Sequence, residues 1–185
     1  MHQMDPIETH IQTIWSFVRL AMLKRVLHEV VPDTQLDLWR IMMGTSLDYG
    51  VIEWCKIFGN RTDDTHWTNV VPDNQHQAFR TGLYAAVEKT QDDWDAYHTE
   101  MKEYRDRYAA HIDFSGTAAS FPDLTPALAA SYYYYAKFLY PEWSGKDPGA
   151  HYPPDMEKFA AEYRHQLCDV ANAAAQATKQ FEPTK

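Results

Sequence analysis

Apolar residues recur at intervals of three and four along most of the chain, whereas strict alternation of apolar and polar residues is hard to find. This spacing places apolar side chains on one face of an α-helix and is not typical of β-strands. Glycine occurs only seven times, so few positions interrupt the helical pattern. The pattern therefore predicts an all-α protein, an up-and-down bundle of five to six helices.

Proline, glycine and N-cap residues predict the helix boundaries. The first helix begins at Asp5-Pro6, because Asp is a favoured N-cap and Pro is tolerated at the first helical position, and it ends before Pro32. The second begins near Asp33 or Thr34 and ends at Gly59. The later helices are predicted over residues 74–87, 91–111 with a capping box at Thr90 and Asp93, 125–140 with Pro141 ending it, and 155–180.

The length suits one domain over residues 1–185, with a core over residues 6–180 and a disordered tail over residues 181–185. The connection over residues 60–73 is long for a compact domain. Trp67, Val70 and Val71 indicate that it packs on the helices, as a lid or as a simple wrap.

Charge and composition limit the location and the partners. Arg19, Lys24 and Arg25 interrupt the most apolar helix, so no membrane span is expected, and residues 1–10 do not resemble a signal peptide. The two cysteines, Cys55 and Cys168, suit buried thiols in a reducing compartment. We therefore expect a cytoplasmic protein. The net charge of −9 argues against broad, non-specific nucleic-acid binding but allows a small basic site.

The predicted fourth helix carries the strongest functional pattern. Projected at 100° per residue, Arg105 and His111 flank an apolar stripe, about 120° apart and roughly 9 Å along the axis. A single regular helix therefore cannot aim both side chains at one phosphate. Either the helix ends near His111 and lets it swing, or a homodimer brings a second Arg and His alongside. The stripe itself consists of Trp94, Tyr97, Met101, Tyr104 and Tyr108.

The segment Arg105-Asp106-Arg107-Tyr108-Ala109-Ala110-His111 resembles the signature of the HEPN superfamily (higher eukaryotes and prokaryotes nucleotide-binding domain): an Arg, a polar residue, four further residues and a His. Leu47-Asp48-Tyr49 and Trp54-Cys55-Lys56-Ile57-Phe58-Gly59 are similar to the AbiU2-like branch of abortive-infection proteins. The resemblance covers about residues 7–140.

This resemblance implies a helical bundle that dimerises through the motif helix and, in many members, is a metal-independent endoribonuclease. Carried over by position, Arg105 and His111 are the expected catalytic pair, with Asp106 at a position where Asn is common. Arg107, Tyr104 and Tyr108 are the expected substrate-binding residues beside them. The implied partners are RNA, a second copy of the chain and an antitoxin protein, in phage defence or a toxin–antitoxin response, with no cofactor.

The implied chemistry is coherent. A histidine with a pKa near neutrality exchanges a proton with the RNA 2′-hydroxyl or the leaving oxygen. An arginine holds the phosphate bidentately and stabilises its growing charge. The expected product is a 2′,3′-cyclic phosphate, formed without a metal ion.

Three other interpretations stay open. Arg107 is one helical turn from both Glu103 and His111, so these residues also suit ordinary surface pairs of a non-catalytic interaction or ligand-binding module. Glu162 and His165 have the spacing of a di-iron ligand pair, with Asp95 and His98 as a poor second half. The four tyrosines at 132–135 offer aromatic faces on which bases can stack. Four consecutive residues point in four directions on a helix, so one or two should be core or interface and the rest partly exposed.

Overall fold

The computed structural model describes residues 5–109, 121–146 and 151–183, and these residues form helices and connecting loops without a β-strand. The predicted all-α bundle is therefore confirmed. No helix among these residues has the length and apolar character needed to cross a membrane.

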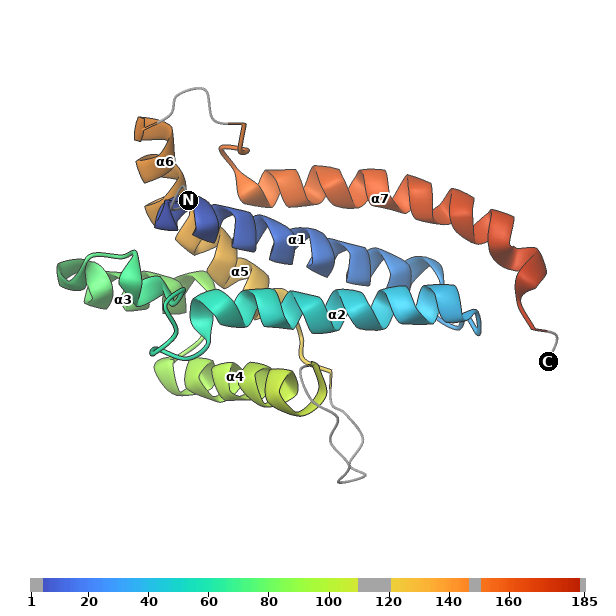
Figure 1. The fold of residues 1–185 in the computed structure, drawn as a ribbon, viewed down its shortest axis with the longest axis horizontal. Helices are drawn as coiled ribbons and strands as arrows, with labels where there is room; N and C mark the ends of the chain where they lie inside the picture. Colours follow the sequence, from blue (N-terminus) through green and yellow to red (C-terminus); the bar gives the residue numbers. More distant parts are fainter. Residues whose placement is uncertain (1–4, 110–120, 147–150, 184–185) are drawn as a thin grey trace.

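Three long helices set the shape of the molecule. α1 (Pro6–Val30) and α2 (Asp37–Phe58) form an antiparallel hairpin, and α7 (Met156–Thr178) lies along the other side of α1 (Figure 1). The predicted N-cap is confirmed, because the Asp5 carboxylate accepts the Ile7 N–H at 2.8 Å. α1 is buried over a wide part of its surface because α2 and α7 both pack against it. α2 begins a few residues later than predicted, at Asp37.

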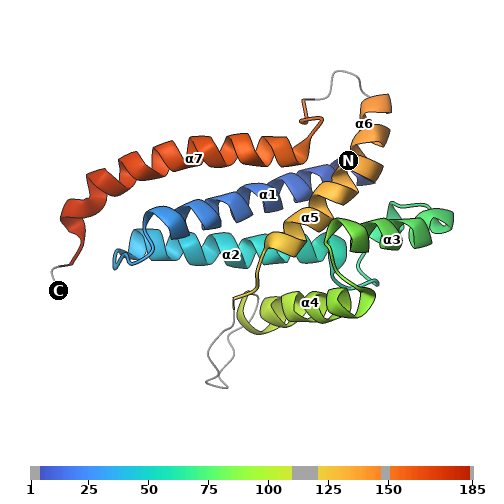
Figure 2. The same ribbon diagram turned by 180° about the vertical axis from the view of Figure 1, so that it is seen from behind.

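The shorter helices cover one end of this hairpin. α5 (Thr125–Tyr134) crosses α1 and α2 on the face seen in Figure 2, and α3 (His76–Ala86) packs against α5. α4 (Gln91–Tyr104) runs along the C-terminal half of α2, while the N-terminal half of α2 extends past it (Figure 1). The predicted capping box is confirmed, since the Thr90 hydroxyl accepts the Asp93 N–H at 3.2 Å.

The prediction that Pro141 ends a helix is wrong. α5 passes into a π-helical turn, Tyr135–Leu139, which leads directly into α6 (Tyr140–Lys146). Pro141 is the second residue of α6, and the wide turn before it relieves the i to i−4 pattern that a proline cannot complete.

The core is rich in aromatic side chains. Trp54 stacks on Phe58 with ring centroids 5.1 Å apart and meets Trp94 edge-on at 6.0 Å, so α2 and α4 share one aromatic cluster. The four tyrosines divide as predicted: Tyr134 and Tyr135 are fully buried, whereas Tyr132 and Tyr133 are half-buried.

The loop after α2 and the C-terminal tail both pack on the helices. The long connection after α2 is held by Trp67 and Val71, both buried, which confirms that it packs down. The C-terminal tail, predicted to be disordered over residues 181–185, is described through Pro183. The Glu182 carboxylate accepts the Gln35 N–H at 2.9 Å and the Thr34 hydroxyl, and these bonds attach the tail to the start of α2.

Candidate functional site

The HEPN-like motif begins where α4 stops being a regular α-helix. α4 ends at Tyr104, and Arg105–Ala109 form a π-helical turn. The projection at 100° per residue that separated Arg105 from His111 therefore does not apply to this segment, and the prediction of a regular helix through residue 111 is wrong. π-helical turns occur frequently at functional sites. His111 lies outside the described residues.

Tyr104 attaches the motif to α2. Its side chain is buried, and its hydroxyl donates a 2.7 Å hydrogen bond to Asp48 Oδ1. Burial and the bond to Asp48 raise the pKa of Tyr104, so the phenol keeps its proton. Asp48 belongs to one of the two α2 segments on which the HEPN resemblance rests. The Tyr104 hydroxyl, expected to bind substrate, thus donates to α2 in this structure.

The other residues of the motif lie nearer the surface. Tyr108 is half-buried with its ring 5.6 Å from that of Tyr104, and the Arg107 guanidinium lies 5.6 Å from the centre of the Tyr108 ring. Asp106 is exposed and accepts a 2.7 Å hydrogen bond from Arg105 Nε. The motif therefore presents a cation, an anion and an aromatic ring along one turn.

Arg105 is largely buried, with its side chain 16% exposed. The hydrogen bond to Asp106 raises the pKa of Arg105, so the guanidinium remains charged. It lies over the end of α2: Arg105 Nη1 is 3.1 Å from the position that a Cβ on Gly59 would occupy. The Cys55 thiol is buried beneath it, and burial raises the pKa of that thiol to about 12. A cysteine in this protonated form is a poor nucleophile.

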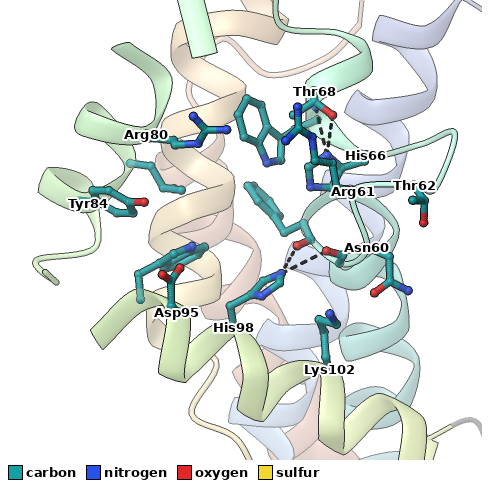
Figure 3. Close-up of a pocket in the computed structure, with 15 residues that line it drawn as sticks. Asn60, Arg61, Thr62, His66, Thr68, Arg80, Tyr84, Asp95, His98 and Lys102 are labelled. Carbon is teal, nitrogen blue, oxygen red and sulfur yellow. Dashed lines mark hydrogen bonds between the residues drawn. The ribbon is translucent and has the colours of Figure 1, made fainter. Parts of the chain in front are cut away.

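Gly59 also lines an open pocket of about 550 Å³, so the pocket adjoins the motif. The pocket lies between α4, α3 and the loop that follows α2 (Figure 3). Its size falls within the usual range for small-molecule sites. It is lined by Phe58, Gly59, Asn60, Arg61, Thr62, His66, Trp67, Thr68, Arg80, Leu83, Tyr84, Trp94, Asp95, His98 and Lys102.

Three permanent cations face this pocket, each from a different element: Arg61 from the loop, Arg80 from α3 and Lys102 from α4 (Figure 3). Asp95 is the one carboxylate among the lining residues. Within the described part of the chain, none of the three cations forms an ion pair. Like charges around one concave surface raise the local potential. In a chain of net charge −9, this pocket is a local concentration of positive charge.

Two histidines in the pocket have assignable protons. His98 Nε2 contacts the carbonyl oxygens of Phe58 and Gly59; because carbonyls only accept, Nε2 carries the proton and Nδ1 is its basic nitrogen. His66 Nδ1 accepts the Thr68 N–H at 3.4 Å, so its proton lies on Nε2. Burial, followed by the nearby His98 and Arg61, lowers the pKa of His66 to about 4. His66 is therefore neutral at pH 7 without a ligand.

Sequence reasoning missed the three cations of the pocket. Arg61, Arg80 and Lys102 are far apart in the chain, and nothing in their local sequence distinguishes them from ordinary surface residues. The available signal was indirect: a long loop with a buried tryptophan, followed by Asp95 and His98 one helical turn apart. Those two residues, considered above as metal ligands, both line the pocket.

The geometry does not assemble the di-iron arrangement. Glu162 and His165 are exposed on α7, and the Glu162 carboxylate lies 3.9 Å from Lys158 Nζ. Over residues 5–109, 121–146 and 151–183, no three His, Cys, Asp or Glu side chains gather in a way that could hold a metal ion.

Comparison of the chain with protein-family models, curated proteins and solved structures gave no match.

Proposed function

We propose that the protein binds RNA in the basic pocket and cleaves it beside Arg105 without a metal ion. The observation that carries the proposal is the meeting of the two features at Gly59: the pocket with its three cations adjoins the arginine of the HEPN-like motif. The proposed setting is phage defence or a toxin–antitoxin response in the cytoplasm. The proposed partners are a second copy of the chain and an antitoxin protein.

The charge distribution supports RNA as the ligand. Phosphate contacts from Lys and Arg dominate the affinity of nucleic-acid binding. Arg61, Arg80 and Lys102 supply such contacts at one place, while the rest of this acidic chain repels the phosphate backbone. Binding is therefore directed to the pocket. Arg105, which is paired with Asp106, adds a charged guanidinium beside the pocket at Gly59.

The proposed reaction follows from the residue types in the motif. His111 removes the proton of the 2′-hydroxyl or donates one to the leaving 5′-oxygen, as the 2′-oxygen attacks the neighbouring phosphorus and the bond to the 5′-oxygen breaks. Arg105 uses its terminal Nη groups on the phosphate while Nε stays on Asp106. The products are a 2′,3′-cyclic phosphate and a 5′-hydroxyl. The role of His111 rests on the family resemblance.

Cleavage of mixed cellular RNA in chelator tests the reaction. We expect His111→Ala and Arg105→Ala each to slow cleavage by about 100-fold or more, because each removes a group that acts in the transition state. Arg164→Ala is the matched control, since Arg164 pairs with Glu29 on the exposed side of α7. If all four proteins bind RNA and leave it intact, the protein is a non-catalytic binding module and not an enzyme. Equal cleavage by all four proteins would contradict the assignment of the pair.

Charge reversal in the pocket tests the binding surface separately. We expect Arg80→Glu and Lys102→Glu each to weaken RNA binding and to reduce the slope of log K against log salt by about 0.7, the value for one contact to a single strand. Lys158→Glu is the control, because that lysine is 73% exposed on α7, away from the pocket. Fluorescence anisotropy with labelled single-stranded RNA at several salt concentrations gives both quantities. A similar effect from all three reversals would point to net charge instead of the pocket.

A further inference from the structure

α2 carries a stripe of apolar side chains that the described helices leave exposed. Leu38 is 55% exposed, Ile41 65% and Tyr49 47%, which is unusual for large apolar residues on one helix. The same helical spacing includes Thr45, which is exposed and lies between Ile41 and Tyr49. It also includes Ile52, which is half-buried and follows Tyr49. We call these five residues the α2 stripe. The opposite face of α2 is buried, with Leu47, Val51 and Trp54 in the core.

The α2 stripe has a two-fold pattern in its own sequence. Ile41 and Tyr49 lie four residues before and after Thr45, and Leu38 and Ile52 lie seven residues before and after it. A two-fold contact needs a surface that is complementary to itself. When two such helices pack antiparallel with Thr45 at the centre, Leu38 of one copy meets Ile52 of the other, and Ile41 meets Tyr49. The small Thr45 side chain lets the helices approach closely at the centre.

Charge at the two ends of α2 favours the antiparallel arrangement. Asp37 begins the helix, is 85% exposed and lies 3.9 Å from Arg40 of the same helix. Lys56 continues the stripe at its end, is 44% exposed and pairs with Glu53. Antiparallel packing brings the end of α2 that carries Lys56 in one copy toward the end that carries Asp37 in the other, while parallel packing sets like charges together. The dipoles of the two helices also point in opposite directions in this arrangement, which is favourable for helices lying side by side.

A further exposed aromatic side chain lies beside the motif. Phe121 is 69% exposed, and its ring centroid is 6.3 Å from that of Tyr104. Tyr104 in turn bonds to Asp48, the neighbour of Tyr49. The N-terminal half of α2, which holds Leu38 and Ile41, extends past α4 and is accessible to another molecule (Figure 1).

We propose that two copies of the chain pair through the α2 stripe in an antiparallel, two-fold contact centred on Thr45. The inference rests on the homodimer included in the proposed function and assigns its surface to α2 in place of the motif helix. Asp48 is three residues from Thr45, about 4.5 Å along the helix. The two motif segments, each attached to Asp48 through Tyr104, therefore lie close to the two-fold axis, on one composite surface.

Cysteine cross-linking tests this geometry, because a residue on a two-fold axis lies next to its own copy. In a Cys168→Ala background, Thr45→Cys is expected to form a disulfide between copies under mild oxidation, seen as a dimer on a non-reducing gel. Cys55 is buried and does not compete. Val170→Cys is the control, since Val170 is also exposed, at 67%, but lies on α7. Cross-linking of Val170→Cys with none of Thr45→Cys overturns the proposal.

Ile41→Glu tests the stripe without a cross-link. Two buried carboxylates in one contact are expected to raise the dimer dissociation constant by about 100-fold or more, measured by analytical ultracentrifugation. Ile41 is exposed in the single chain, so circular dichroism should show an unchanged fold. A monomeric wild-type protein overturns the dimer. If Ile41→Glu leaves the dimer intact, the α2 stripe is not the dimer contact. This outcome is independent of the RNA cleavage assay, which tests the proposed function.

Discussion

Acidification from pH 7 to pH 4 is expected to cost the fold several kcal/mol, because His10 and His66 are buried in their neutral form. His10 is 2% exposed, and its Nδ1 lies 2.8 Å from the Tyr134 hydroxyl in the core. Burial, followed by the nearby His66, lowers the pKa of His10 from 6.5 to about 4. His66, also buried, has its pKa lowered to about 4 by burial and by His98.

The direction of the effect follows from proton uptake. Below pH 6.5 the histidines of the unfolded chain bind protons, while those of the folded chain stay neutral down to about pH 4. Unfolding is therefore favoured progressively through this window, and neither histidine affects stability above it. At 1.36 kcal/mol per pKa unit, His10 alone accounts for about 3 kcal/mol.

Urea unfolding across this pH range measures the loss directly. His10→Gln is expected to give a shallower dependence of the free energy of unfolding on pH, because one of the two titrating groups is gone. The pKa of Asp5 is lowered, mainly by the Ile7 N–H. Asp5 therefore stops stabilising the fold only as the pH falls below 3.8, so between pH 6.5 and pH 4 the change in stability comes mainly from the histidines. A free energy of unfolding that is the same at pH 7 and pH 4 would contradict the neutral burial of both rings.

Gly59→Ala is expected to destabilise the protein by about 1–3 kcal/mol and to disturb the site at the same time. A Cβ at this position would lie 2.2 Å from the Cys55 carbonyl oxygen, far inside van der Waals contact with backbone. The end of α2 must shift to accept it, and both Arg105 and the wall of the pocket rest on that end. RNA cleavage should fall more than the loss of folded protein explains.

Gly44→Ala provides the comparison on the same helix. Nothing lies within 4 Å of the Cβ that this substitution adds, so we expect it to stabilise α2 by up to about 1 kcal/mol through helix propensity. Thermal unfolding of both variants and cleavage by the folded fraction complete the test. If Gly59→Ala matches the wild type in stability and cleavage, the close approach at the end of α2 has no role.

The sequence predicted the elements better than the places where they bend. The caps at Asp5, Thr90 and Gly59 were found because capping depends on residues within one turn. The π-helical turns Arg105–Ala109 and Tyr135–Leu139 were missed, because a regular and a widened turn of the same sequence differ in how they pack on other helices. Pro141 was misread for the same reason.

The residues of the motif could be identified from the sequence, whereas the pocket could not. Arg105 and Asp106 stand in a short continuous segment, so a pattern of spacing was enough to single them out. The pocket joins Arg61, Arg80 and Lys102 only after three elements fold together, and its charge is a property of that arrangement. Tyr104 illustrates an intermediate case: its position beside the motif was evident, whereas its hydrogen bond to Asp48 depends on how α4 meets α2.

A π-helical turn is an α-helical turn with one residue inserted, so the turn at Arg105–Ala109 separates two phases of the chain. Residues before it keep the phase that points Trp94, Tyr97 and Met101 into the core. None of the residues in the turn itself, Arg105–Ala109, is fully buried. The core packing of α4 can thus remain unchanged while the inserted residue places Arg105–Ala109 nearer the surface.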